Sequence, residues 1–173
     1  MKKLEDLVRV VPDFPKPGIS FKDVTTVLQD ADGLQMAVDA MCDMVKDIDV
    51  DVIAGAEARG FVFASAMAYK LHKPLVLVRK KGKLPFETVS ETYDLEYGTA
   101  SIEIHKDAIA PGQKVLLVDD LIATGGTLAA SERLINKLGG KTVAVAVLME
   151  LEGLCGRDLF ECPVYSVLKY PDK

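Results

Sequence analysis

Short runs of apolar residues alternate along this chain with segments whose apolar residues recur every three or four positions. Four runs are continuous enough to be strands buried on both faces: residues 52–55, 75–78, 115–118 and 142–149. Helical spacing occurs before the first of these runs, over residues 33–47, and between later ones, over residues 61–71 and 128–138. A further apolar run, 164–168, ends the series. This alternation predicts an α/β fold with a mostly parallel sheet flanked by helices.

Two stretches break this rhythm. Residues 11–18 hold three prolines and a glycine, which predicts an irregular segment, whereas residues 2–11 have the spacing of a short helix. Residues 88–93 and 99–104 alternate polar and apolar side chains. We therefore expect a β-hairpin that projects from the sheet and is mobile enough to act as a lid.

The stretch 115–128 carries the clearest chemistry, because its strand runs into Asp119 and Asp120 and then into a loop, 123–127, before a helix. N–H groups at a helix N-terminus lack partners within the helix, and the helix dipole adds partial positive charge, so this loop suits a phosphate. The two carboxylates would repel a phosphate and better suit sugar hydroxyls or a hydrated Mg²⁺. Together they describe a phosphorylated ribose. The alternative is an ordinary turn in which Thr124 caps the helix.

Positive charge gathers where a polyanion would need it. The basic cluster 79–83 follows the run 75–78 directly, at the edge where an open sheet places its ligands. Arg59, at a predicted helix N-terminus, can pair with phosphate oxygens. The alternatives are a solvated charge run and an ion pair between Arg59 and a local acid such as Glu57.

Composition excludes several classes of partner. The chain has 173 residues, a net charge of −5 and a pI near 5.1, which argues against nucleic-acid binding. No apolar run approaches the ~20 residues needed to cross a membrane. The three cysteines show no C-x-x-C spacing, so we expect neither a metal cluster nor a disulfide framework. This cysteine content is typical of a protein in the reducing cytoplasm.

Six segments are similar, in order, to the motifs of the adenine phosphoribosyltransferases, a branch of the type I phosphoribosyltransferases. They are F-P-K-P-G-I-S-F-K-D-V at 14–24, E-A-R-G-F at 57–61, R-K-K-G-K-L-P at 79–85, Y-D-L-E-Y-G at 93–98, V-L-L-V-D-D-L-I-A-T-G-G-T at 115–127 and E-L-E-G-L-C-G-R at 150–157. The resemblance implies one domain over residues 1–173, with an N-terminal hood at about 12–28 and a flexible hairpin at about 83–104. It also implies purine salvage, in which adenine and phosphoribosyl pyrophosphate give AMP and pyrophosphate.

The resemblance assigns roles residue by residue. The catalytic carboxylate is Glu96, and Tyr97 gates the loop. The adenine-binding residues are Ser20, Phe21, Lys22 and Leu151. The pyrophosphate-binding residues are Ala58, Arg59, Gly60, Arg79, Lys80 and Lys83. The residues that bind the ribose and its phosphate are Asp119, Asp120, Ala123, Thr124, Gly125, Gly126 and Thr127.

The resemblance further implies Mg²⁺, held through substrate and water rather than by protein ligands, and a homodimer. Lys22 stands where many relatives have Arg; recognition of adenine by the backbone would survive that change. Ala123 stands where hypoxanthine–guanine phosphoribosyltransferases usually have an acid that handles the proton of the base, which favours adenine. Two alternatives remain: a non-catalytic metabolite sensor like the purine repressors, and an enzyme of the same class that acts on xanthine.

Overall fold

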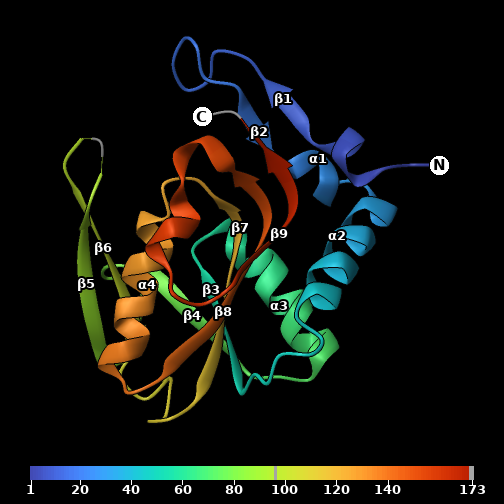
Figure 1. Ribbon diagram of the computed structural model, residues 1–173. Helices are drawn as coiled ribbons and strands as arrows, with labels where there is room; N and C mark the ends of the chain where they lie inside the picture. Colours follow the sequence, from blue (N-terminus) through green and yellow to red (C-terminus); the bar gives the residue numbers. More distant parts are fainter. Residues whose placement is uncertain (96, 172–173) are drawn as a thin grey trace.

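The computed structural model describes residues 1–95 and 97–171, and its centre is a seven-stranded sheet of order β5-β6-β4-β3-β7-β8-β9 (Figure 1). Five neighbouring strands are parallel: β4 (Leu75–Lys80), β3 (Val52–Ala56), β7 (Lys114–Ile122), β8 (Lys141–Leu151) and β9 (Val164–Tyr170). Every strand predicted from an apolar run is present. The mostly parallel α/β fold is confirmed.

Helices cover both faces of this sheet. The helices α2 (Ala31–Met44) and α3 (Arg59–Leu71) lie on one face, and α4 (Gly126–Lys137) lies on the other (Figure 1). Side chains of successive strand residues point to opposite faces, so the core divides into two apolar clusters, one beneath each helical layer. Asp30 caps α2 by accepting the N–H of Gly33. None of the helices in the described residues is long and apolar enough to cross a membrane.

The helix α3 lies unusually close to β3 and β7. A Cβ placed on Gly55 would lie 2.7 Å from the Cβ of Ala64, and one on Gly60 would lie 3.1 Å from the Cα of Asp119. Side chains at these two positions would push the helix away from the sheet. Glycine at both positions therefore brings the first turn of α3 directly against β7.

The N-terminal residues form a small two-stranded sheet above the main one (Figure 1). A short 3-10 turn, η1 (Leu4–Leu7), leads into β1 (Arg9–Val11), which pairs antiparallel with β2 (Phe21–Asp23). The short helix α1 (Thr25–Leu28) follows. The prediction of a helix over residues 2–11 is therefore wrong beyond η1.

Contacts with residues far along the chain explain this difference. The Arg9 guanidinium donates to Asp23 from Nε at 2.9 Å, and the Arg9 N–H donates to the hydroxyl of Thr26. These bonds hold Arg9 in an extended strand. The local spacing of apolar residues contains no signal for a partner 14 residues away.

The predicted hairpin is formed by β5 (Thr88–Asp94) and β6 (Thr99–His105). Its β6 strand pairs with the end of β4, and β5 lies along α4, where Glu91 accepts from Arg133 at 3.1 Å and pairs with Lys137 at 2.8 Å. Most of the hairpin is therefore held against the fold. Two 3-10 turns, η2 (Glu152–Leu154) and η3 (Gly156–Leu159), connect β8 to β9.

The close contact between α3 and β3 gives a test of the packing. We expect Gly55→Ala to lower the free energy of unfolding by about 1–3 kcal/mol, because its methyl group would overlap the Ala64 side chain. Ser65→Ala, on the exposed side of α3, is the matched control and should change stability by less than about 0.5 kcal/mol. Urea unfolding measures both. Equal stability of Gly55→Ala and the parent protein would show that α3 can move off the sheet without cost.

Candidate functional site

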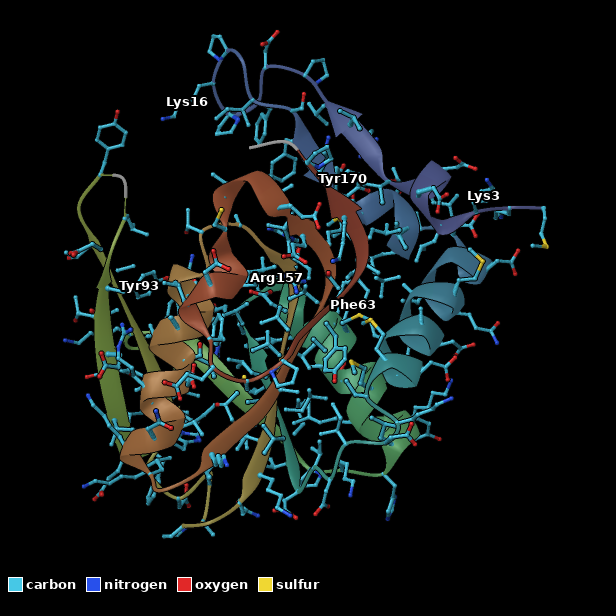
Figure 2. The ribbon with its side chains drawn as sticks, in the orientation of Figure 1. Lys3, Lys16, Phe63, Tyr93, Arg157 and Tyr170 are labelled. Carbon is cyan, nitrogen blue, oxygen red and sulfur yellow. The ribbon has the colours of Figure 1, made fainter. Side chains whose placement is uncertain are left out.

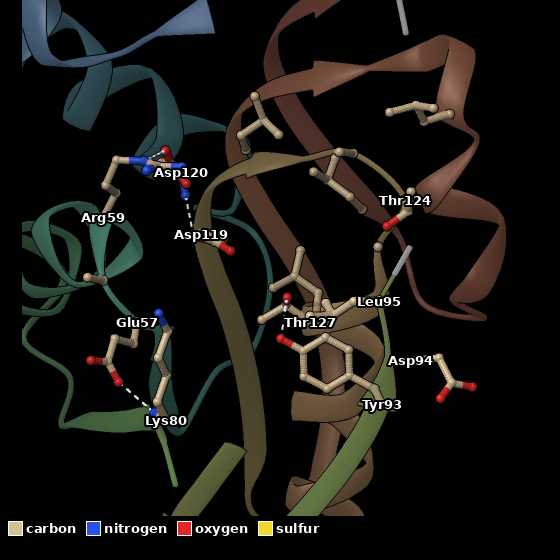
Figure 3. A pocket seen from close by; sticks show the side chains of 18 residues that line it. Glu57, Arg59, Lys80, Tyr93, Asp94, Leu95, Asp119, Asp120, Thr124 and Thr127 are labelled. Atoms are coloured by element: carbon tan, nitrogen blue, oxygen red, sulfur yellow. Dashed lines mark hydrogen bonds and ion pairs between the residues drawn. The ribbon is translucent and has the colours of Figure 1, made fainter. Parts of the chain in front are cut away.

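A cavity of about 910 Å³ opens at the carboxyl ends of the parallel strands (Figure 3). It is lined from four parts of the chain. The ends of β3 and β4 and the start of α3 contribute Glu57, Ala58, Arg59 and Lys80. The hairpin contributes Tyr93, Asp94 and Leu95, and Leu154 comes from η2. The largest share, residues 119–128, comes from the end of β7 and the loop that follows it.

The loop 123–127 forms one wall and leads into α4. Gly125 has φ +83°, a left-handed conformation that favours glycine, and α4 begins at the next residue. No side chain among the described residues caps this helix, so its first N–H groups remain available beside the cavity. The predicted phosphate-binding residues Ala123, Thr124, Gly126 and Thr127 all line the cavity with Gly125.

Asp119 and Asp120 also line the cavity, but the structure places them inside a strand rather than after one. The β7 strand continues to Ile122, because its pairing with β8 persists past the two acids. Asp120 is buried and accepts a hydrogen bond from Nε of Arg59 at 2.6 Å (Figure 3). The sequence predicted Arg59 and Asp120 for different parts of the substrate, and the structure joins them as an ion pair. The local partner Glu57 is not the residue that Arg59 contacts.

Asp119 experiences a different environment from its neighbour. Its Oδ1 accepts the N–H of Asp120 at 2.8 Å, and the backbone of Gly60 packs against it. Burial, followed by the negative charge of Asp120, raises the pKa of Asp119 well above the usual range of an aspartic acid. Arg59 opposes this shift only weakly, because its hydrogen bond goes to Asp120.

The two segments predicted to bind pyrophosphate meet because β3 and β4 are parallel neighbours. Glu57, whose peptide bond to Ala58 is cis, links them. Its carboxylate accepts the N–H of Lys80 (Figure 3) and also lies 3.6 Å from the Arg79 guanidinium. Ala58 and Lys80 reach the cavity, whereas Arg79 and Lys83 do not line it. Arg79 instead donates to the backbone oxygen of Lys83 at 3.4 Å.

A second, smaller cavity of about 410 Å³ lies beneath the N-terminal sheet. Its apolar wall includes Phe14 and Phe21, whose rings meet edge to face with centroids 5.2 Å apart. Arg59 lines both this cavity and the larger one, so the two adjoin at its side chain. Neither Ser20 nor Leu151 lines either cavity.

Lys22 does not point into the second cavity. The residue is only 8% exposed, and its Nζ lies 4.8 Å from the ring centroid of Tyr170. Tyr170 is the last residue of β9 (Figure 2). A cation–π contact of this kind holds the N-terminal sheet to the C-terminal strand. The side chain of Lys22 therefore has a packing role, which sequence reasoning did not anticipate.

The tip of the hairpin carries the two residues that the resemblance linked to catalysis. Glu96 lies outside the described residues. Tyr97 is 80% exposed, and Lys16 of the N-terminal segment approaches its ring with Nζ 5.2 Å from the centroid. Leu95 lines the larger cavity, and its N–H donates to the Gly98 carbonyl.

Tyr93 is a cavity residue that the sequence analysis did not single out. Its hydroxyl lies 3.0 Å from the hydroxyl of Thr127, and its ring lies against the backbone of Gly126 (Figure 3). The sequence could have indicated this position, because side chains two residues apart in a strand lie on the same face. Glu91 and Tyr93 therefore both point toward α4. Among the described residues, no group of three or more His, Cys, Asp or Glu side chains could hold a metal ion.

Comparison with known proteins identifies the family. Residues 27–171 match the model of the phosphoribosyl transferase domain. The chain belongs to the phosphoribosyltransferase family. It is 61% identical to the adenine phosphoribosyltransferase of Butyrivibrio fibrisolvens over 96% of this chain and 93% of that one. It is 59% identical to that of Agathobacter rectalis over the full length of both.

Solved phosphoribosyltransferase structures agree with this assignment. The adenine phosphoribosyltransferase of Thermoanaerobacter pseudethanolicus superposes with a TM-score of 0.93 at 46% identity, covering 97% of this chain and all of that one. The Saccharomyces cerevisiae enzyme, complexed with adenine and an imino-altritol bisphosphate, gives 0.89 at 37% identity over 95% and 96% of the two chains. The resemblance inferred from the sequence motifs is confirmed.

The raised pKa of Asp119 has a measurable consequence. In the unfolded chain an aspartate loses its proton near pH 4. In the folded protein Asp119 keeps its proton to a higher pH, so between these two pKa values the native state holds one proton more than the unfolded state. The free energy of unfolding therefore falls as the pH rises through this window. Asp119→Asn keeps an acceptor oxygen but cannot ionise. We expect it to be more stable than the parent protein near pH 7, with the difference closing toward about pH 4.

Melting temperatures across that pH range measure the effect. Asp47→Asn, at an exposed position, controls for the loss of one negative charge. A stability difference between Asp119→Asn and the parent protein that stays constant with pH would contradict a raised pKa at Asp119.

Proposed function

We propose that this phosphoribosyltransferase transfers the phosphoribosyl group of phosphoribosyl pyrophosphate to adenine and releases AMP and pyrophosphate. The observation that carries the proposal is the junction at Arg59. There an apolar, aromatic cavity suited to a planar base meets a polar cavity with a helix N-terminus and carboxylates. The names of the relatives, all adenine phosphoribosyltransferases, support the choice of base.

In this proposal, residues 123–127 bind the 5′-phosphate through N–H groups at the start of α4 and through the hydroxyls of Thr124 and Thr127. Asp119 and Asp120 accept hydrogen bonds from the ribose hydroxyls. Holding the sugar still in this way lowers the entropic part of the barrier. In this proposal the loop 123–127 binds the phosphate, and the end of the strand that precedes it, β7, binds the diol.

Ala58, Arg59, Gly60, Arg79, Lys80 and Lys83 form the proposed pyrophosphate site. Lys80 lines the cavity directly, and the backbone of Ala58 lies beside it. Arg59 would exchange some of its contact with Asp120 for phosphate oxygens, since a guanidinium can serve both. Arg79 and Lys83 do not line the cavity, and in this proposal they act through their positive charge. The hydrogen bond from Arg79 to the backbone oxygen of Lys83 fixes the end of β4.

Mg²⁺ is proposed as the cofactor, carried by phosphoribosyl pyrophosphate and water. The oxygen donors of Asp119 and Asp120 at the cavity fit a hydrated hard cation. When bound, the ion would offset the charge of departing pyrophosphate. The chain's own share of that task falls to Arg59 and Lys80.

Adenine is proposed to lie in the smaller cavity against Phe21, with its polar edge read by the backbone from Ser20 to Lys22. The Lys22 side chain, directed to Tyr170, anchors this backbone rather than touching the base. Leu151 would cover the opposite face of the ring. An uncharged planar base suits aromatic contacts and backbone hydrogen bonds.

Attack by adenine on the sugar carbon requires a proton to leave the base. Ala123 cannot take it, so Glu96 is the proposed acid/base, and Tyr97 the residue that gates the hairpin. Closure of the hairpin over the cavity would exclude water, which otherwise hydrolyses the activated sugar. The transition state would resemble an oxocarbenium ion, as in glycosyl transfer.

We further propose one domain over residues 1–173, with the hood at about 12–28 and the flexible hairpin at about 83–104, acting in the cytoplasm as a homodimer. Leu75, Leu77 and Phe86 support the dimer, because they expose apolar side chains on and beside β4 that a second copy could cover. The cysteines, free among the described residues, support a reducing compartment.

The first test offers adenine, hypoxanthine, guanine and xanthine separately with phosphoribosyl pyrophosphate and Mg²⁺, and follows pyrophosphate release. Release with adenine alone is expected. Release with a 6-oxopurine would keep the phosphate sites but overturn the assignment of the smaller cavity. Tight binding of phosphoribosyl pyrophosphate without release for any base would indicate a metabolite sensor.

The role of Glu96 is tested separately. Glu96→Gln should slow turnover by about 10²–10⁴-fold, because the amide cannot exchange the proton, and should leave the affinity for phosphoribosyl pyrophosphate within about twofold. Glu87→Gln, an exposed glutamate near the base of the hairpin, is the matched control and should keep full activity. Unchanged turnover in Glu96→Gln would remove this residue from the mechanism.

A further inference from the structure

The turn between β8 and β9 lies directly behind the phosphate loop. A Cβ placed on Gly156 would lie 2.3 Å from the carbonyl oxygen of Ala123 and 2.9 Å from the nitrogen of Gly125. A Cβ on Gly125 would in turn lie 2.7 Å from the carbonyl oxygen of Gly156. The two backbones therefore touch with no side chain between them. Any displacement of the turn must displace the loop or open a gap behind it.

The backbone of this turn includes one conformation that is energetically unfavourable. Cys155, between η2 and η3, has φ +55°, in the left-handed region that a residue with a side chain occupies only at some energetic expense. Its N–H donates to the carbonyl of Glu152, and its carbonyl accepts from Asp158.

An ion pair between buried Glu150 and half-buried Arg157 also holds the turn. Glu150, the residue before the last of β8, is 2% exposed and accepts two hydrogen bonds from Arg157, from Nε at 2.6 Å and from a terminal nitrogen. The hydroxyl of Ser166 on β9 donates to the same carboxylate. Hydrogen bonds from Arg157, above all, lower the pKa of Glu150 despite its burial, so the pair is charged at neutral pH. Glu150, Arg157 and Ser166 together form what we term the clasp.

The clasp closes the turn at both ends. Glu150 precedes η2 and Arg157 lies in η3, so their bonds draw the ends of the turn together and join them to β9 through Ser166. Arg157 does not line the substrate cavity, and Figure 2 shows it among the C-terminal elements rather than at the hairpin. The clasp acts on the cavity only through the turn.

We propose that Arg157 and Glu150 are positioning residues for the 5′-phosphate: by fixing the turn behind residues 123–125, they hold the loop's N–H groups in the geometry that binds phosphate. This inference rests on the proposed function. It predicts that loosening the clasp weakens binding of the ribose phosphate and spares binding of pyrophosphate. The residues proposed to bind pyrophosphate lie around the start of α3 and the end of β4, and none belongs to the turn or to residues 123–125.

The test measures two ligands by calorimetry on the full chain: ribose 5-phosphate, which carries only the loop's phosphate, and Mg²⁺-pyrophosphate. Arg157→Met should raise the Kd of ribose 5-phosphate about tenfold, the equivalent of one charge-assisted hydrogen bond, and change that of pyrophosphate less than about twofold. Arg157→Lys, which keeps the charge but not the paired bonds, should be intermediate. Ser166→Ala, which removes one bond, should have the smallest effect and covers the case in which Arg157→Met fails to fold.

Two controls separate positioning from general stability. Val45→Ala, in the core beneath α2, should lower the melting temperature without changing the Kd of ribose 5-phosphate. The double variant Glu150→Met/Arg157→Met removes both charges, so it should regain much of the stability that Arg157→Met loses. It should not regain the affinity for ribose 5-phosphate, because two methionines cannot reproduce the paired bonds.

The outcomes are distinct. If the parent protein binds ribose 5-phosphate and Arg157→Met binds it equally well, the clasp is only structural and the inference is wrong. The inference is equally wrong if the double variant regains affinity together with stability, or if Val45→Ala weakens binding as much as Arg157→Met. If the parent protein itself binds no ribose 5-phosphate, the proposed function of the loop fails, and the inference fails with it.

Discussion

The contact between the first turn of α3 and the end of β7 is the constraint on which the site depends. Gly60 has no side chain, so the backbone of α3 can pack directly against the backbone of Asp119 in β7. In this position Arg59 reaches Asp120, and it lines both cavities. A larger residue at position 60 would separate these groups even if the sheet itself survived.

The same contact also reduces electrostatic repulsion at the site. The chain has a net charge of −5, which would repel a polyanionic ligand unless the acids near the cavity were offset. Three of the four described acids that line the cavity are offset, each in a different way. Arg59 neutralises Asp120, burial favours the protonated form of Asp119, and Glu57 is held by the N–H of Lys80 and by Arg79. Asp94 is the fourth of these acids, and the Lys80 side chain and the N-terminus of α4 supply positive charge at the same cavity. The negative charge at the cavity is therefore largely offset.

Local sequence patterns predicted the parallel sheet and the phosphate loop, because buried strands and βα turns are encoded by neighbouring residues. These patterns failed where a contact with a residue far along the sequence determines the local structure. The β7 strand reaches Ile122 because β8 keeps pairing beyond two acids that locally look like its end. The Lys22 side chain turns to Tyr170, and Tyr93 meets Thr127, through contacts that the sequence does not encode locally. The motif resemblance located most of the cavity's residues, but it could not show that Arg59 pairs with Asp120.

The contacts that hold the hairpin differ in number and strength along its length. At its base, Glu91 pairs with two cations of α4, whereas nearer the tip a single hydrogen bond joins Tyr93 to Thr127. At the tip, the exposed contact between Lys16 and Tyr97 contributes about 0.5–1 kcal/mol, little more than thermal energy. The neutral hydrogen bond contributes about 0.5–1.5 kcal/mol. If the hairpin opens as proposed, the weak contact at its tip should break first. The contact between Tyr93 and Thr127 lies between the tip and Glu91, so a wider opening would also remove a contact with the loop 123–127.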